Sequence, residues 1–172
     1  MPITLTYTGT NVEVQRAVTK AAAMLTSNEL LEIIRRRKTP FDDSVPANLS
    51  PSKIAEYFRD TNLELTVETY SGNDPDIGGY FNTGRPTVIH VNLKNLPQRR
   101  DCSTAAMLVH ECTHALSYQI KKKHDISFSH TGPRSNNNQT APYWIQKKVR
   151  LALCNDKNIQ VEALDTAPEE VQ

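Results

Sequence analysis

The sequence predicts an α+β fold in which one small mixed sheet packs with several helices. Along the chain the predicted order is strand, helices, strand, strand and helices, with no internal repeat and no linker. The 172 residues are enough for one hydrophobic core and too few for two. We therefore expect a single domain over residues 1–162. A mobile tail is predicted over residues 163–172, which contain Pro168 and two adjacent glutamates.

Alternation of apolar and polar residues predicts three short strands. The segments Ile3–Tyr7, Leu63–Tyr70 and Thr87–Leu93 show this period of two. Between the last two, Ser71–Pro86 is rich in Gly, Asn, Asp and Pro. This segment is predicted to be a loop, and its length is typical of a functional loop rather than a mere connection.

Helical spacing of apolar residues, together with capping residues, predicts five helices. The expected helices are Val12–Leu25 after Thr10 or Asn11, Glu29–Lys38 after Ser27, a third from Ser50-Pro51, a long one from Ser103 to about Lys123, and Ala141–Cys154 after Thr140. The polar segment 124–138 between the last two helices is predicted to be a loop.

The charge balance gives no indication of a polyanionic partner. Lys and Arg total 20, Asp and Glu total 19, and the formal net charge is +1. Nucleic-acid binding would depend on the basic runs Arg35–Lys38, Arg99-Arg100 and Lys147-Lys148, which lack interleaved aromatic residues. Cations at a helix C-terminus complement the macrodipole, and this interpretation is favoured for Arg35–Lys38. For these reasons we expect no nucleic-acid partner. We also expect no membrane partner, because the longest apolar stretch, Ala21–Leu25, is far too short for a bilayer.

The three cysteines, Cys102, Cys112 and Cys154, do not form a regular pattern. An odd count without a C-x-x-C pair predicts reduced thiols and a reducing compartment. The first residues, Met1–Leu5, lack the basic and apolar regions of a secretory signal. The expected location is therefore cytoplasmic, or outside the cell by a route that needs no cleaved signal.

The sequence His110-Glu111-Cys112-Thr113-His114 lies within the long predicted helix. Residues four apart share one face of a helix, so His110 and His114 can direct two imidazole nitrogens at one metal ion. Glu111 lies at the edge of that face, where it can reach a metal-bound water as general base. Cys112 falls on an apolar stripe, nearly opposite the histidines, and is expected to be a small buried residue.

The segment Met107–Tyr118 resembles the active-site helix of the zincin metallopeptidases. It is similar to small bacterial members of effector or toxin type and to gluzincin-like members, over about residues 80–150. The resemblance implies a single zincin-like domain, a Zn²⁺ cofactor, and hydrolysis of an amide in a protein, a peptide or a peptidoglycan cross-bridge. It also implies that the strand Thr87–Asn92 is the sheet edge that pairs with extended substrate.

A catalytic zinc site needs a third protein ligand besides the two helical histidines. Ser117 and Ile120 exclude the metzincin pattern of Gly followed by His. Gluzincins take an acid from a following helix, where this chain has the neutral Gln139. His130 is the favoured third ligand because imidazole binds zinc well and its loop returns toward the helix. The remaining alternatives are Glu162 and Asp165, with His124 disfavoured after three lysines and His90 left open between core and cleft.

Two further questions follow from the motif. Tyr143 or Tyr118 could stabilise an oxyanion, although a packing role is favoured for both. The leading hypothesis is zinc-dependent peptide hydrolysis, and the alternative is a catalytically impaired zincin-fold protein that binds other proteins. The alternative is motivated by Gln139 in the place of an acid.

Overall fold

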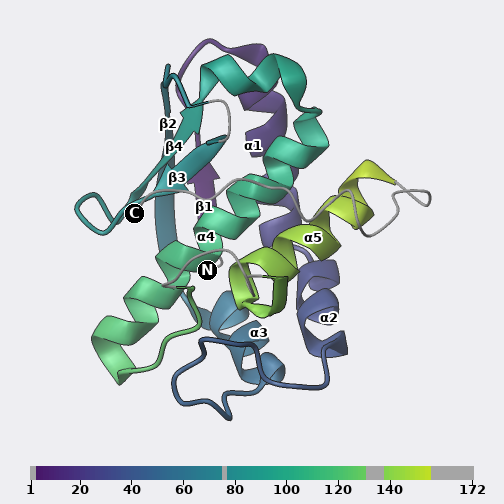
Figure 1. The fold of residues 1–172 in the computed structure, drawn as a ribbon, viewed down its shortest axis with the longest axis vertical. Coiled ribbons are helices and arrows are strands. Elements are labelled where there is room, and N and C mark those ends of the chain that lie inside the picture. The colour runs from purple at the N-terminus through teal and green to yellow at the C-terminus, as the bar shows by residue number, and fades with distance from the viewer. Residues whose placement is uncertain (1–2, 75–76, 131–137, 156–172) are drawn as a thin grey trace.

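The computed structural model describes residues 3–74, 77–130 and 138–155 (Figure 1). Within them, helices and strands follow one another in the predicted α+β order. The elements are β1 (Ile3–Thr6), α1 (Val12–Leu25), α2 (Asn28–Arg36), α3 (Pro51–Asp60), β2 (Leu63–Tyr70), β3 (Gly79–Phe81), β4 (Val88–Asn92), the 3-10 helix η1 (Leu93–Gln98), α4 (Asp101–His124) and α5 (Ala141–Cys154). The predicted tail and the end of the predicted domain lie outside the described residues.

The four strands form one mixed sheet in the order β1-β2-β4-β3. The first three are mutually parallel, and β3 runs antiparallel to β4 at the edge. Two expectations are corrected here. Ser71–Pro86 is not entirely a loop, because it contains β3, which is too short for alternation to reveal it. Thr87–Asn92 is not the edge, because β4 is flanked by β2 and β3.

The capping residues mark most of the predicted helix starts. Side chains of Asn11, Ser27 and Ser50 accept hydrogen bonds from the first turns of α1, α2 and α3, as expected. Helix α2 ends at Arg36 rather than Lys38, because Arg37 is extended and its guanidinium donates to two backbone carbonyls of the following turn.

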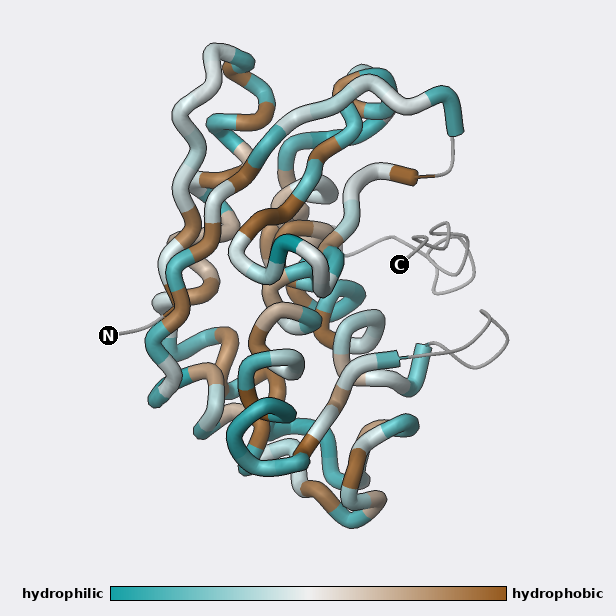
Figure 2. The backbone as a smooth tube through the Cα atoms, turned by 90° about the vertical axis from the view of Figure 1, so that its left-hand side faces the viewer, coloured by the Kyte–Doolittle hydropathy of each residue, from teal (hydrophilic) through white to brown (hydrophobic). Residues whose placement is uncertain are grey.

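Helix α4 runs through the middle of the molecule and contacts α1, α5 and β3 (Figure 1). Its predicted apolar stripe is buried, but so is every residue of the helix from Thr104 to Ser117. Figure 2 colours the hydrophobic residues of the described chain brown. The helix starts at Asp101 rather than after a Ser103 cap, since Asp101 pairs with Lys20 of α1 at 3.1 Å and accepts from the backbone N–H of Cys102. None of the described helices combines the length and the apolar character that a membrane span requires.

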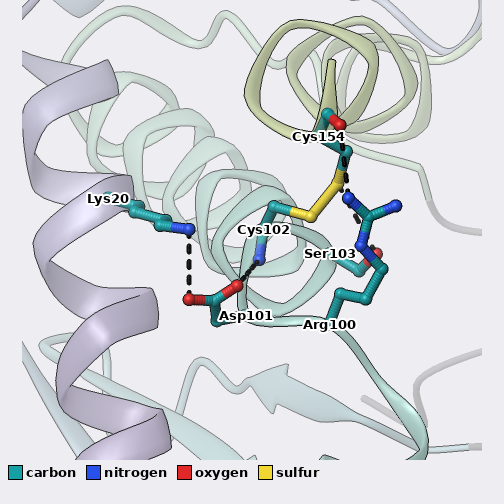
Figure 3. Close-up of a disulfide and its surroundings, with 6 residues drawn as sticks. All are labelled: Lys20, Arg100, Asp101, Cys102, Ser103 and Cys154. Atoms are coloured by element: carbon teal, nitrogen blue, oxygen red, sulfur yellow. Dashed lines mark hydrogen bonds and ion pairs between the residues drawn. A yellow bond between two sulfur atoms is a disulfide. The ribbon is translucent and has the colours of Figure 1, made fainter. Parts of the chain in front are cut away.

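A disulfide between Cys102 and Cys154 joins the start of α4 to the end of α5 (Figure 3). This corrects the expectation of three reduced thiols. The pairing depends on the packing of α5 along α4, which brings the two Cα atoms to 5.4 Å, and a sequence separation of 52 carries no local signal for it. Cys112 is a free thiol inside α4, as expected of a buried small residue, and burial raises its pKa.

Candidate metal centre

Three histidine side chains converge in the interior, two from α4 and one from the segment that follows it. His110 and His114 lie one turn apart on α4, and the chain returns after the helix to place His130 against both. The Nε2 atom of His114 lies 3.0 Å from the Nε2 atoms of both His110 and His130. The Nε2 atoms of His110 and His130 are 3.5 Å apart. All three ring edges are therefore directed at one point.

This donor set fits a zinc ion. Zn–N bonds of about 2.0–2.1 Å in tetrahedral geometry separate the ligand nitrogens by about 3.3 Å. The separations of 3.0, 3.0 and 3.5 Å among the three Nε2 atoms bracket that value. A neutral imidazole carries one N–H, so three Nε2 atoms cannot satisfy one another fully, whereas one cation satisfies all three lone pairs. The three histidines can thus hold a metal and leave a fourth position open.

Burial keeps His110 and His114 in the neutral form that binds metal. Desolvation, followed by the neighbouring histidines, lowers the pKa of His110 well below its ordinary value. Desolvation and then His130 lower the pKa of His114 to about 3. Metal ligation requires neutral imidazole, so these rings need not lose a proton at neutral pH in order to bind.

The other ring nitrogen of His114 faces a serine. Nδ1 of His114 forms a short hydrogen bond with Oγ of Ser129, the residue before the third histidine. With Nε2 directed at the metal position, the proton belongs on Nδ1 and Ser129 accepts it. On the opposite side, the Gln146 side chain and the Pro142 backbone of α5 raise the pKa of His110, against the larger effect of burial. Ser129 therefore orients the ring of His114, whereas Nδ1 of His110 makes no hydrogen bond of normal length among the described residues.

Hydrogen bonds to two other parts of the chain hold the segment that leads to His130. The backbone N–H of Phe128 donates to Oγ of Ser117 on α4 at 2.9 Å, and the Phe128 ring is fully buried. Ser127 exchanges two backbone hydrogen bonds with Val45, at 2.7 and 3.0 Å. The loop before α3 is thus hydrogen-bonded to the loop after α4. This support comes from residues distant in sequence, and no local pattern predicts it.

Glu111 is buried between the histidines and the edge strand. Its side chain is 1% exposed, and its Oε2 accepts a hydrogen bond from the backbone N–H of Phe81 at 2.7 Å. Its Oε1 lies 3.7 Å from Nε2 of His110. One carboxylate oxygen is therefore held by β3, while the other faces the metal position. A backbone donor such as Phe81 leaves no trace in the side-chain pattern of a sequence.

Tyr143 forms one wall of the centre. Its ring centroid lies 4.6 Å from that of His110 and 4.7 Å from that of His130. The ring is buried, and it comes from the first turn of α5. Trp144 points elsewhere and packs edge-on against Phe41 at 5.5 Å. Tyr143 therefore packs against the histidines themselves.

The other candidate ligands are placed elsewhere or lie outside the described residues. Oε1 of Gln139 accepts from the Arg37 guanidinium at 2.9 Å, so this side chain is engaged away from the histidines. His124 is exposed at the end of α4, and His90 stacks on Tyr80 at 4.5 Å on the sheet. Glu162 and Asp165 lie outside the described residues. Gln139 therefore does not contribute to the three-histidine cluster.

A pocket of about 150 Å³ opens beside His114. Phe81 and Tyr118 form apolar walls, with their ring centroids 6.1 Å apart. The described residues that line it are Phe81, Thr83, His114, Ser117, Tyr118, Lys121, Ser127 and Ser129. Of the three histidines, His114 is the one among the described residues that line this pocket.

The centre combines a fixed carboxylate, three converging imidazoles and an adjoining pocket, an arrangement suited to metal-assisted hydrolysis. In comparisons with family models, with curated proteins and with solved structures, no match to this chain was found. The chain is an α+β domain with a buried three-histidine group that could hold a metal ion.

Proposed function

We propose that the chain is a zinc-dependent metallopeptidase, with His110, His114 and His130 as metal ligands and Glu111 as general base. The observation that carries the proposal is the position of Glu111. Its Oε1 faces the ligand nitrogens, with Nε2 of His110 3.7 Å away, while the Phe81 N–H holds Oε2. A structural metal site would have no need of a buried carboxylate beside three histidine ligands, and three protein ligands are typical of catalytic zinc.

Residues of the chain would carry out the remaining catalytic steps. Zinc, when bound, supplies Lewis acidity that activates water and polarises an amide carbonyl. Glu111 takes the proton of the attacking water as general base. The same carboxyl group then gives that proton to the leaving amine as general acid. Tyr143 lies against two of the ligands and closes that side of the centre to solvent. Phe81 and its strand keep the base in place.

We propose a protein or peptide as substrate, because β3 is an edge strand beside the catalytic carboxylate. Phe81 is opposite Ile89 in the antiparallel pair, and its N–H points away from β4 to Glu111. Extended peptides pair with exposed sheet edges through main-chain hydrogen bonds. A peptidoglycan cross-bridge would present the same amide group. Nucleic acid and membrane are not proposed as partners.

We further infer that the protein matures in an oxidising compartment. Disulfides persist in secreted and periplasmic proteins and are rare in the cytosol. The pair Cys102–Cys154 therefore favours the exported alternative over a cytoplasmic one.

The test is metal analysis combined with peptide hydrolysis. The purified chain should contain one zinc, hydrolyse members of a peptide library, lose that activity with a chelator and regain it with zinc. Glu111→Gln should retain the zinc and lose activity by a factor of about 100 to 10,000, the typical contribution of a general base. Glu13→Gln, an exposed change of the same kind on α1, is the control. Activity that survives in Glu111→Gln would contradict the mechanism, and a zinc-loaded chain that cleaves no peptide would contradict the proposed function.

A further inference from the structure

The pocket beside His114 has a donor-rich chemistry that selects for a negatively charged side chain. We propose that it binds a substrate Asp or Glu next to the scissile amide. The position of this side chain next to a scissile amide rests on the proposed peptidase function. The preference for an acidic residue rests on the side chains that line the pocket.

The hydroxyl groups of the pocket are arranged as donors. Oγ of Ser117 accepts the backbone N–H of Phe128 at 2.9 Å. Oγ of Ser129 accepts Nδ1–H of His114 when that ring ligates metal through Nε2. Each hydroxyl is therefore already an acceptor toward the protein, which leaves its hydrogen to donate to a ligand.

Lys121 adds a positive charge on the same side of α4. It lies one turn beyond Ser117, lines the pocket and is exposed. It has no acidic partner among the described residues, and no carboxylate is found among the described residues that line the pocket. An ammonium group offers three donors and no acceptor, and the described lining adds hydroxyl groups but no negative charge that could pair with a cationic ligand. A carboxylate, which only accepts, matches it.

The size and walls of the pocket fit one side chain. Its volume of about 150 Å³ is well below the roughly 300–1,000 Å³ of sites for drug-sized ligands. The Phe81 and Tyr118 rings can cover the methylene stem of an acidic residue, while Ser129 and Lys121 reach its carboxylate. Phe81 also holds Glu111, so the pocket shares a wall with the catalytic base.

Binding of two matched inhibitors tests the pocket without turnover. The probes are short peptide hydroxamates that anchor on the metal and differ only in a Glu or a Gln beside the hydroxamate. Calorimetry with the zinc-loaded chain should give about tenfold tighter binding of the Glu probe, because hydrogen bonds to a charged group are stronger than those to an amide. Lys121→Glu should abolish or reverse this preference. Lys123→Glu makes the same charge change at an exposed position outside the pocket and should retain it.

Cleavage data separate this inference from the proposed function. In a peptide library the zinc-loaded chain should cut preferentially beside Asp or Glu. Hydrolysis without that preference, or equal binding of the two probes, would overturn the acidic pocket and leave the peptidase intact. A Glu-probe preference that depends on Lys121 in a chain that cleaves no peptide would support the pocket and overturn the peptidase.

Discussion

Oε2 of Glu111 accepts the backbone N–H of Phe81 at 2.7 Å, which ties the acid of the central helix to the edge strand of the sheet. A buried carboxylate that receives a backbone hydrogen bond is held in one orientation. The edge strand on which an extended substrate would lie is therefore also the strand that aims the base. Under the proposed function, substrate binding and the position of Glu111 would be coupled through the Phe81 peptide group.

Removal of that N–H should impair turnover more than binding. Phe81→Pro lacks the donor, and proline is tolerated on edge strands where the N–H points away from the ladder. We expect kcat for peptide hydrolysis to fall about tenfold or more, with a smaller change in KM, because Glu111 loses its anchor. Phe81→Leu retains the N–H and changes only the ring. Equal kcat values for the two variants would show that the hydrogen bond does not position the base.

His130 should be required for metal binding, and His124 should not. His130→Ala removes a ligand and should weaken zinc affinity by more than about 100-fold, since even loss of a group behind a ligand costs 10- to 100-fold. His124→Ala removes an exposed histidine from the end of α4 and serves as the matched control. Competition with a zinc-binding dye measures both affinities. If His130→Ala binds zinc as tightly as the unaltered chain, the third ligand is another group.

The disulfide should contribute substantially to stability. A cross-link over a separation of 52 residues restricts the unfolded chain by about 4 kcal/mol in the loop-entropy model. Urea denaturation with and without a reductant should show a decrease in the free energy of unfolding of that order. The double variant Cys102→Ser/Cys154→Ser should no longer respond to the reductant. Thiol titration of the denatured, unreduced chain should find one thiol, from Cys112, whereas three thiols would contradict the pairing.

Acid should destabilise the metal-free chain through its buried histidines. Burial lowers the folded-state pKa of His114 to about 3, below its unfolded value of about 6.5. Between these values the unfolded chain binds a proton that the folded chain does not. The stabilising contribution is therefore complete above about pH 6.5 and is lost as the pH falls toward 3, with a slope of up to about 1.4 kcal/mol per pH unit. His114→Gln, compared by urea denaturation across this range, should show a shallower slope, and identical slopes would contradict a lowered pKa.

Local chemistry in the sequence predicted those parts of the molecule that depend on neighbouring residues. Asn11, Ser27 and Ser50 cap helices because each side chain accepts a hydrogen bond from the backbone N–H three residues ahead. His110 and His114 share a face because a separation of four residues is close to the turn of about 3.6 residues. The convergence of His130 was favoured on ligand chemistry, and the geometry agrees with it.

The parts that were missed depend on packing between distant segments. Strand β3 is held by pairing with β4 and by Glu111 rather than by its own three residues. The cysteine pair forms because α5 lies along α4. Ser129 acts on His114 only after the chain has reversed direction behind α4. None of these relationships has a characteristic spacing that a sequence could show.

The disulfide between Cys102 and Cys154 closes a covalent ring that contains more than the helices α4 and α5. His110, Glu111, His114, His130 and Tyr143 all lie between the two cysteines, so the whole proposed centre belongs to one covalent ring. A single backbone cut anywhere in that ring leaves the two fragments joined. Such a nicked molecule would migrate as one band without reductant and as two with it, and it would keep every ligand on the same covalent molecule.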